Sequence, residues 1–248
     1  MSFKKFSLPK ITSFILHLLA MTLMLFDHLW ACSILPQDIF SWLGRIAYPI
    51  FAFMVVEGYF HTSSYKKYIK RMFLWALIAE IPFNLMYSSS FIYPFHQNVL
   101  WTFLLGLLAI GLIEKIRTKK KPLLTCFVFL AIAVLTYLLG FMLFVDYFGY
   151  GILMIFVFYL FRSKKWWCYI AQALCLFYIN WEMISGLSVP LEFFGHEIYF
   201  VQQGIACLAL LPIWLYNGKQ GPHNKMIQYS FYAFYPAHML LLYLLRQL

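Results

Sequence analysis

Residues 11–26, ITSFILHLLAMTLMLF, decide the class of this chain because they read as a membrane-spanning helix. Asp27 and His28 follow directly, with no loop between them and the apolar run. An aspartate inside hydrocarbon costs roughly 2.5–3.5 kcal/mol on insertion scales, so polar partners must compensate it. The pair is therefore the first candidate for a functional site.

The composition extends this interpretation to the whole chain. Of the 248 residues 63% are apolar and 11% are charged, whereas soluble domains average about 45–50% and about 25%. No polar block is long enough to form a soluble domain. We therefore predict one all-α polytopic membrane helical bundle, a single transmembrane domain of residues 1–248. The five cysteines show no CxxC spacing, so we expect neither a metal site nor disulfides.

Nine apolar segments have lengths typical of membrane spans. They are 11–33, 41–62, 68–88, 98–115, 122–143, 146–162, 166–184, 199–216 and 226–246. All lysines and arginines except Arg45 and Arg246 then fall on one side, which predicts the N-terminus inside and the C-terminus outside. The net charge of +10 is explained by these loops, which we expect to contact anionic lipid headgroups rather than nucleic acid. The outer loop 182–198 is interpreted as a lid or an interfacial segment.

Arg45 opens the second segment at the same outer level as Asp27. Because basic residues are otherwise almost absent from that side, we expect Arg45 to be the counter-ion of Asp27. The alternative is an interfacial arginine that extends to the lipid headgroups.

Polar residues of the third and fourth segments gather at this outer level. Glu80 and Asn84 are four residues apart on one helix, and no lysine of that helix is within reach of Glu80. Gln97, Asn98 and Thr102 open the fourth segment. For Asn98 a helix-capping role is the alternative, and it is compatible with a role in the site.

A second polar group lies deeper and toward the inner side. Glu57 and His61 are four residues apart and share a helix face near the inner end. Their structural alternative is a helix end at His61 and a salt bridge from Glu57 to Lys66 or Lys67. Three histidines lie in loops and carry little signal: His96, His196 and His223.

Tyr235 and His238 lie three residues apart on the last segment, around Pro236 and near mid-membrane. A lone histidine on an apolar helix is more often a packing residue. Here a tyrosine and a proline kink accompany it, which favours a role in the site.

Together these blocks resemble the TraX family, named for a membrane protein linked to acetylation of the conjugative F pilin. The resembling stretches are Phe26–His28, LGRIAYPIFAF at 43–53, VEGYFHT at 56–62, EIPF at 80–83, QNVLWT at 97–102 with Gly106, and YPAH at 235–238. The resemblance implies a multi-pass protein of the bacterial cytoplasmic membrane. It also implies acyl transfer from cytoplasmic acetyl-CoA to an extracytoplasmic acceptor: a glycan, a lipid-linked molecule, or a protein amine or hydroxyl. A pilin need not be that acceptor.

Within that chemistry, His28 is the expected base that removes the acceptor proton, since histidine titrates near neutral pH. Asp27 or Glu80 would orient its ring, as the acid of a catalytic triad does. Arg45 or Asn98 would stabilise the developing oxyanion.

The remaining polar residues are assigned to a passage for substrate and acyl group. These residues are Glu57, His61, Asn84, Gln97, Thr102, Tyr235 and His238. The expected partners are membrane lipids, the acyl donor and the acceptor, with a homo-oligomer left open. The alternative function is a multi-pass transporter or exporter of a small or lipid-linked substrate, and a weaker one is a passive assembly scaffold.

Overall fold

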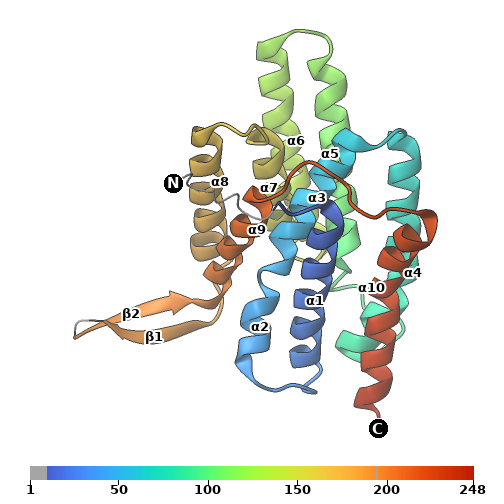
Figure 1. Ribbon diagram of the computed structural model, residues 1–248, viewed down its shortest axis with the longest axis vertical. Coiled ribbons are helices and arrows are strands. Elements are labelled where there is room, and N and C mark those ends of the chain that lie inside the picture. Colours follow the sequence, from blue (N-terminus) through green and yellow to red (C-terminus); the bar gives the residue numbers. More distant parts are fainter. Residues whose placement is uncertain (1–9, 194) are drawn as a thin grey trace, which may run out of the picture.

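The computed structural model describes residues 10–193 and 195–248, which form a bundle of helices with one projecting hairpin (Figure 1). The long helices are α1 (Ser13–Ala31), α3 (Ala47–His61), α4 (Tyr65–Ser88), α5 (Val99–Arg117), α6 (Pro122–Met142), α7 (Phe148–Leu160), α8 (Trp166–Tyr178) and α10 (Lys225–Arg246). Two short helices are α2 (Asp38–Gly44) and α9 (Leu210–Trp214). A π-helical turn, Ile179–Met183, extends α8, and a 3-10 helix, Gln202–Ala209, precedes α9.

The predicted helical class is confirmed, since each of the nine apolar segments contains a helix. Within the described residues, four helical segments are long and apolar enough to cross a membrane: Ser13–Ala31, Asp38–His61, Val99–Arg117 and Pro122–Met142. The chain is thus a membrane protein with at least four candidate spans. The count of nine spans and their orientation stay predictions.

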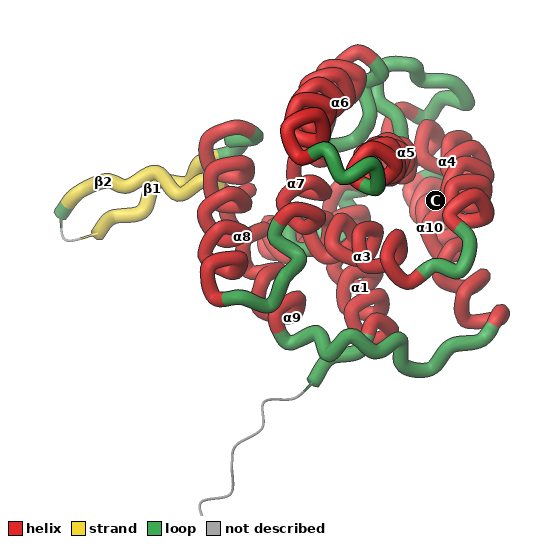
Figure 2. The backbone as a smooth tube through the Cα atoms, turned by 90° about the horizontal axis from the view of Figure 1, so that it is seen from above, coloured by secondary structure: helices red, strands yellow, loops and turns green. Residues whose placement is uncertain are grey.

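The expectation for residues 182–216 is corrected by a β-hairpin. Strands β1 (Ser188–Phe193) and β2 (His196–Val201) pair antiparallel, with Ser188 opposite Val201. Figure 2 shows the hairpin projecting from the bundle next to α8. The predicted span at 199–216 was wrong at its start, because its first three residues belong to β2 and the α-helix begins only at Leu210. Gly195, with φ +77°, and the run of β-branched and aromatic residues IYFV at 198–201 were the available signals for a hairpin.

Helix α3 lies in the centre and positions the rest. It packs against α1, α5 and α7, and Ile50, Ala52 and Val56 on it are fully buried. Figure 2 shows these neighbours around it when the bundle is seen from above. Helix α10 packs on α4 and α1, which brings the last helix back to the first. Residues that are far apart in the sequence therefore meet in one bundle interior.

Helix α6 is held to the bundle by a close approach of backbones. Only Thr136 and Gly140 of this helix are buried, and most of its apolar side chains point outward. A Cβ atom at Gly140 would lie 2.6 Å from the backbone nitrogen of Gly149, inside van der Waals contact. The absence of a side chain at Gly140 is what allows α6 and α7 to touch, as small residues do between membrane helices.

Replacing Gly140 by leucine should therefore separate α6 from α7 and destabilise the protein by about 1–3 kcal/mol, the usual cost of overpacking. The measurement is the thermal denaturation midpoint of the purified protein in detergent. Ala131→Leu is the matched control, because Ala131 lies on the exposed face of the same helix. Equal midpoints for the two variants would contradict the proposed contact.

Candidate functional site

Asp27 and Arg45 form the predicted ion pair. Arg45 Nη2 lies 2.9 Å from Asp27 Oδ1, and the two side chains are 25% and 20% exposed. Arg45 Nη2 also donates to Ser41 Oγ, which in turn accepts from Gln202 Nε2. The pairing interpretation of Arg45 is thus confirmed, and the pair joins α1 to the segment between α2 and α3.

His28 faces a different partner from its neighbour Asp27. Its Nδ1 lies 2.7 Å from Nε2 of His238, and the two rings stack with centroids 4.9 Å apart. Both histidines are buried. Adjacent residues on a helix point about 100° apart, so Asp27 can hold Arg45 while His28 meets α10.

One further contact decides which ring nitrogens of this histidine pair carry protons. His238 Nδ1 lies 2.7 Å from the carbonyl oxygen of Phe234, which can only accept, so Nδ1 carries the proton. In a neutral ring Nε2 of His238 is then an acceptor, and His28 must donate to it from Nδ1. The lone pair of His28 therefore lies on Nε2, for which the described residues provide no hydrogen-bonding partner. This is the tautomer that a general base requires.

The acids expected to orient His28 lie elsewhere, which corrects that part of the prediction. Asp27 is engaged by Arg45, and Glu80 Oε2 accepts from Trp101 Nε1 at 2.8 Å and from Asn98 Nδ2. His238 is the residue that orients His28. Sequence reasoning missed this contact because helices α1 and α10 are 210 residues apart at that point.

Asn98 also differs from its expected role as an oxyanion donor. Its Nδ2 donates to Glu80 and to the carbonyl oxygen of Ala76, so both amide hydrogens are used. Its Oδ1 caps α5 by accepting from the backbone N–H of Leu100, as the capping alternative predicted. Arg45 retains a free donor, since its Nε is buried and has no hydrogen-bond partner within the described chain.

Three residues assigned to the passage make hydrogen bonds to loop carbonyls. Thr102 donates to the carbonyl oxygen of Asp146, Gln97 donates to carbonyls of Tyr93 and Pro94, and Asn84 donates to the carbonyl of Phe91. The accepting carbonyls lie in the loops that precede α5 and α7. We find no contact that places these three side chains in a substrate passage.

A cavity of about 640 Å³ opens at the end of the bundle where α3 ends and α4 begins. Glu57, His61 and Tyr235 of the predicted passage line it, and so does His17. Its lining also includes the following side chains, of which the first three are buried: Met24, Val99, Phe103 and Phe234. Met24 and Phe234 each precede a member of the histidine pair by four residues, so the cavity lining comes within about one helical turn, roughly 5.4 Å, of the pair, although neither histidine lines it.

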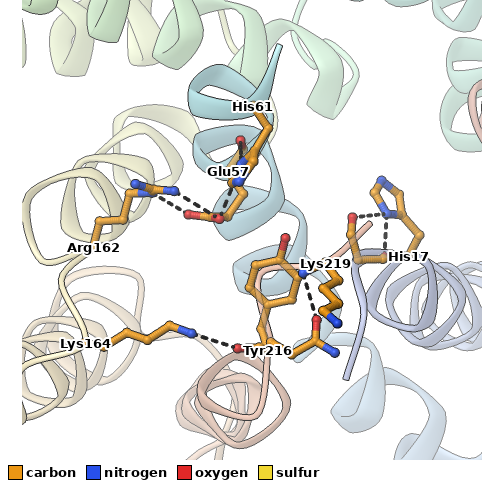
Figure 3. Close-up of polar contacts among 9 residues, drawn as sticks. His17, Glu57, His61, Arg162, Lys164, Tyr216 and Lys219 are labelled. Atoms are coloured by element: carbon orange, nitrogen blue, oxygen red, sulfur yellow. Dashed lines mark hydrogen bonds and ion pairs between the residues drawn. The ribbon is translucent and has the colours of Figure 1, made fainter. Parts of the chain in front are cut away.

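The carboxylate of Glu57 at this cavity is already neutralised. Arg162 binds it through Nε at 2.5 Å and Nη2 at 3.3 Å, and Figure 3 shows the two side chains facing each other between α3 and α7. The structural alternative, a salt bridge from Glu57 to Lys66 or Lys67, was therefore wrong in its partner. His61 donates from Nδ1 to the carbonyl of Glu57 at 2.8 Å, and His17 bonds the carbonyl of Ser13 in the same way.

In the loops before α5 and α7, at the opposite end of α4 from the first cavity, His96 and Asp146 form a second dyad that sequence reasoning dismissed. His96 Nε2 lies 3.3 Å from Asp146 Oδ1, and both line a second cavity of about 660 Å³. Burial lowers the pKa of His96. The hydrogen bond and the charge of Asp146, with a contribution from Glu80, together outweigh burial, so the pKa lies above its ordinary value. Tyr87, from α4, lines the same cavity and contacts both His96 and His28, with ring centroids 5.1 and 6.4 Å apart.

These contacts define a class: a helical membrane protein whose buried histidine pair lies between two cavities. One cavity is lined by the junction of α3 and α4, and the other by the loops that precede α5 and α7. Comparison with known proteins then identifies the family. The chain belongs to the TraX family, because the family model described as TraX protein matches residues 13–246. It is 28% identical over 213 residues, 81% of this chain and 80% of the other, to the probable fimbrial assembly protein FimC, serogroup H1, of Dichelobacter nodosus. No solved structure matches.

The Asp27–Arg45 pair should show a coupling energy of about 1–3 kcal/mol in a double-mutant cycle, because either residue alone would leave a poorly hydrated charge. The cycle compares Asp27→Asn, Arg45→Gln and the double variant by unfolding in mixed micelles. The control cycle uses Glu114 and Arg117, a pair three residues apart whose arginine is 63% exposed, where we expect less than about 1 kcal/mol. A coupling no larger than the control would show that the pair does not stabilise the fold.

The raised pKa of His96 should depend on Asp146. In Asp146→Asn, burial, the largest influence on this pKa, is opposed only by the weaker effect of the Glu80 charge, so the pKa of His96 should fall below its ordinary value. The measurement is a pH titration of the imidazole NMR signals, assigned by their loss in His96→Gln. Asp38→Asn is the matched control, since Asp38 binds Trp30 Nε1 outside the cavity. A His96 pKa that is unchanged in Asp146→Asn would exclude this dyad.

Proposed function

We propose that this protein is an acetyl-CoA-dependent membrane acyltransferase that modifies an extracytoplasmic amine or hydroxyl. The observation that carries the proposal is the position of the His28–His238 pair between the two cavities. The cavity lined by Glu57 and His61, here called the inner cavity, has lining residues about one turn from the pair. Tyr87 lines the cavity of His96 and Asp146, here called the outer cavity, and its ring contacts His28. A donor and an acceptor on opposite sides of the membrane would meet at this point.

The proposed topology has nine spans, with the N-terminus inside and the C-terminus outside. Its support is that loops 62–64, 118–121, 162–165 and 217–224, in or beside which most of the basic residues fall, lie at one end of the bundle (Figure 1). Positive charge of this kind marks the cytoplasmic side of membrane proteins. The inner cavity, which opens at this end, then faces the cytoplasm, where acetyl-CoA would be supplied.

In the proposed reaction, His28 Nε2 removes the proton from the acceptor as its nitrogen or oxygen attacks the thioester carbonyl carbon. The Nδ1–H of the resulting imidazolium stays bonded to His238, whose own proton is held by the Phe234 carbonyl. The free Nε–H of Arg45 is the candidate donor to the tetrahedral oxyanion. When the carbon–sulfur bond breaks, the coenzyme thiolate takes the proton from His28.

The identity of the acceptor is suggested by a similar protein and not by the contacts of the site. One similar protein is named as a fimbrial assembly protein, so a pilus or fimbrial subunit is one acceptor to test. A transporter would instead need Glu57 and Glu80 to bind a substrate or a coupling proton. Glu57 is bound by Arg162, and this contact favours the enzyme, whereas Glu80 accepts from Asn98 and Trp101 through Oε2 alone.

Purified protein should release free coenzyme thiol from acetyl-CoA when membrane extract is supplied. His28→Gln should lower that rate at least about 100-fold, the usual contribution of a general base. His238→Leu should lower the rate similarly, while His238→Gln should retain more of it, since a glutamine oxygen can accept from His28 Nδ1.

Thr22→Ala is the control for the His28 and His238 variants, because Thr22 lies exposed on α1 and bonds only the carbonyl of Leu18. Size-exclusion profiles and melting midpoints show that each variant folds. Thiol release by the wild type no greater than that of heat-inactivated protein would reject the enzyme. Movement of a substrate without acetyl-CoA would favour the transporter.

A further inference from the structure

The mouth of the inner cavity presents two cations that no acid neutralises. Lys67 and Arg71 both line it, one turn apart on α4. Within the described part of the chain, neither side chain has a carboxylate within 4.0 Å, whereas Arg45, Arg117 and Arg162 each have one. Unpaired cations are expected on a solvated surface, but these two face a cavity that reaches toward the middle of the bundle.

Arg71 has a further unsatisfied group. Its Nε is buried and has no hydrogen-bond partner among the described residues. The guanidinium lies 5.8 Å from the centroid of the Tyr68 ring, and the burial of Tyr68 keeps that ring in place. A buried donor without a partner costs about 1–3 kcal/mol, which a ligand with several acceptor oxygens would recover.

The start of α4 adds backbone donors at the same place. Ser64 caps this 24-residue helix by accepting from the N–H of Lys67, and Thr62, Ser63 and Ser64 all line the cavity. The N-terminus of a helix carries partial positive charge and free N–H groups, an arrangement that suits phosphate. The acid of the cavity lining, Glu57, does not oppose this charge because Arg162 binds it.

We propose that Lys67, Arg71 and the first turn of α4 form a binding site for the phosphate groups of a phosphorylated ligand in the inner cavity. The proposal deepens the proposed function, on which its choice of coenzyme A as the ligand rests. The apolar walls beyond the site, down to Phe103 and Tyr235, suit the uncharged arm of such a molecule. A lipid headgroup would supply the same phosphate chemistry, so the test includes both sources.

The test is calorimetric titration of the purified protein with free coenzyme A, which carries no acyl group and needs no acceptor. We expect Lys67→Ala and Arg71→Gln each to weaken binding at least about tenfold. Lys66→Ala and Lys70→Ala are matched controls, because these exposed lysines flank the pair on α4 and do not line the cavity. They should stay within about twofold of the wild type.

Three further probes identify the phosphate as the recognised group. Inorganic pyrophosphate should compete with coenzyme A, affinity should fall as salt rises, and pantetheine without phosphate should bind the wild type and both variants alike. For the lipid source, nanodiscs of phosphatidylcholine are compared with nanodiscs containing phosphatidylglycerol. Retention of phosphatidylglycerol that depends on Lys67 and Arg71 would support the anion site with a headgroup as its ligand.

The site is overturned if coenzyme A and phosphatidylglycerol bind the wild type and the two variants equally, or if no phosphate-bearing probe binds the wild type. Its failure is distinguishable from that of the enzyme. Binding that depends on Lys67 and Arg71 without thiol release supports the site and rejects the proposed reaction. Thiol release with unchanged coenzyme affinity in both variants rejects the site alone.

Discussion

The hydrogen bond between His28 and His238 ties the first long helix to the last, and the arrangement of the site depends on it. Both rings are buried, so their nitrogens have few partners other than protein groups. The Phe234 carbonyl supplies one partner and thereby sets the proton positions in both rings. A single backbone oxygen on α10 thus determines which nitrogen of α1 is left with a free lone pair.

The same requirement for internal partners links the other helices. Asp27 holds Arg45 between α1 and α3, Glu57 holds Arg162 between α3 and α7, and Glu80 bonds the start of α5. Each of these polar contacts crosses between helices and also leaves the histidine pair free of competing acids. Isolation of the pair from carboxylates, together with a cavity on either side of it, is the feature from which the acyl-transfer proposal is built.

The sequence predicted those elements for which one local rule sufficed. The scarcity of outer basic residues led to the Asp27–Arg45 pair, and the position of Asn98 before an apolar run indicated its cap. The histidine pair, the His96–Asp146 dyad and the hairpin at 188–201 were missed. The two histidine contacts join residues 210 and 50 positions apart, and an apolar hairpin strand resembles the start of a span in a hydropathy count.

By itself the sequence determined that this is an all-helical membrane protein, where its charged loops fall, and which side chains are too costly to bury alone. These are properties of composition and local periodicity, which need no knowledge of contacts. Tertiary structure decided which polar groups meet, which His28 nitrogen is free, and which passage residues line a cavity. Those outcomes depend on how α10 packs against α1 and α4, and pairing between distant helices is not encoded in any local pattern.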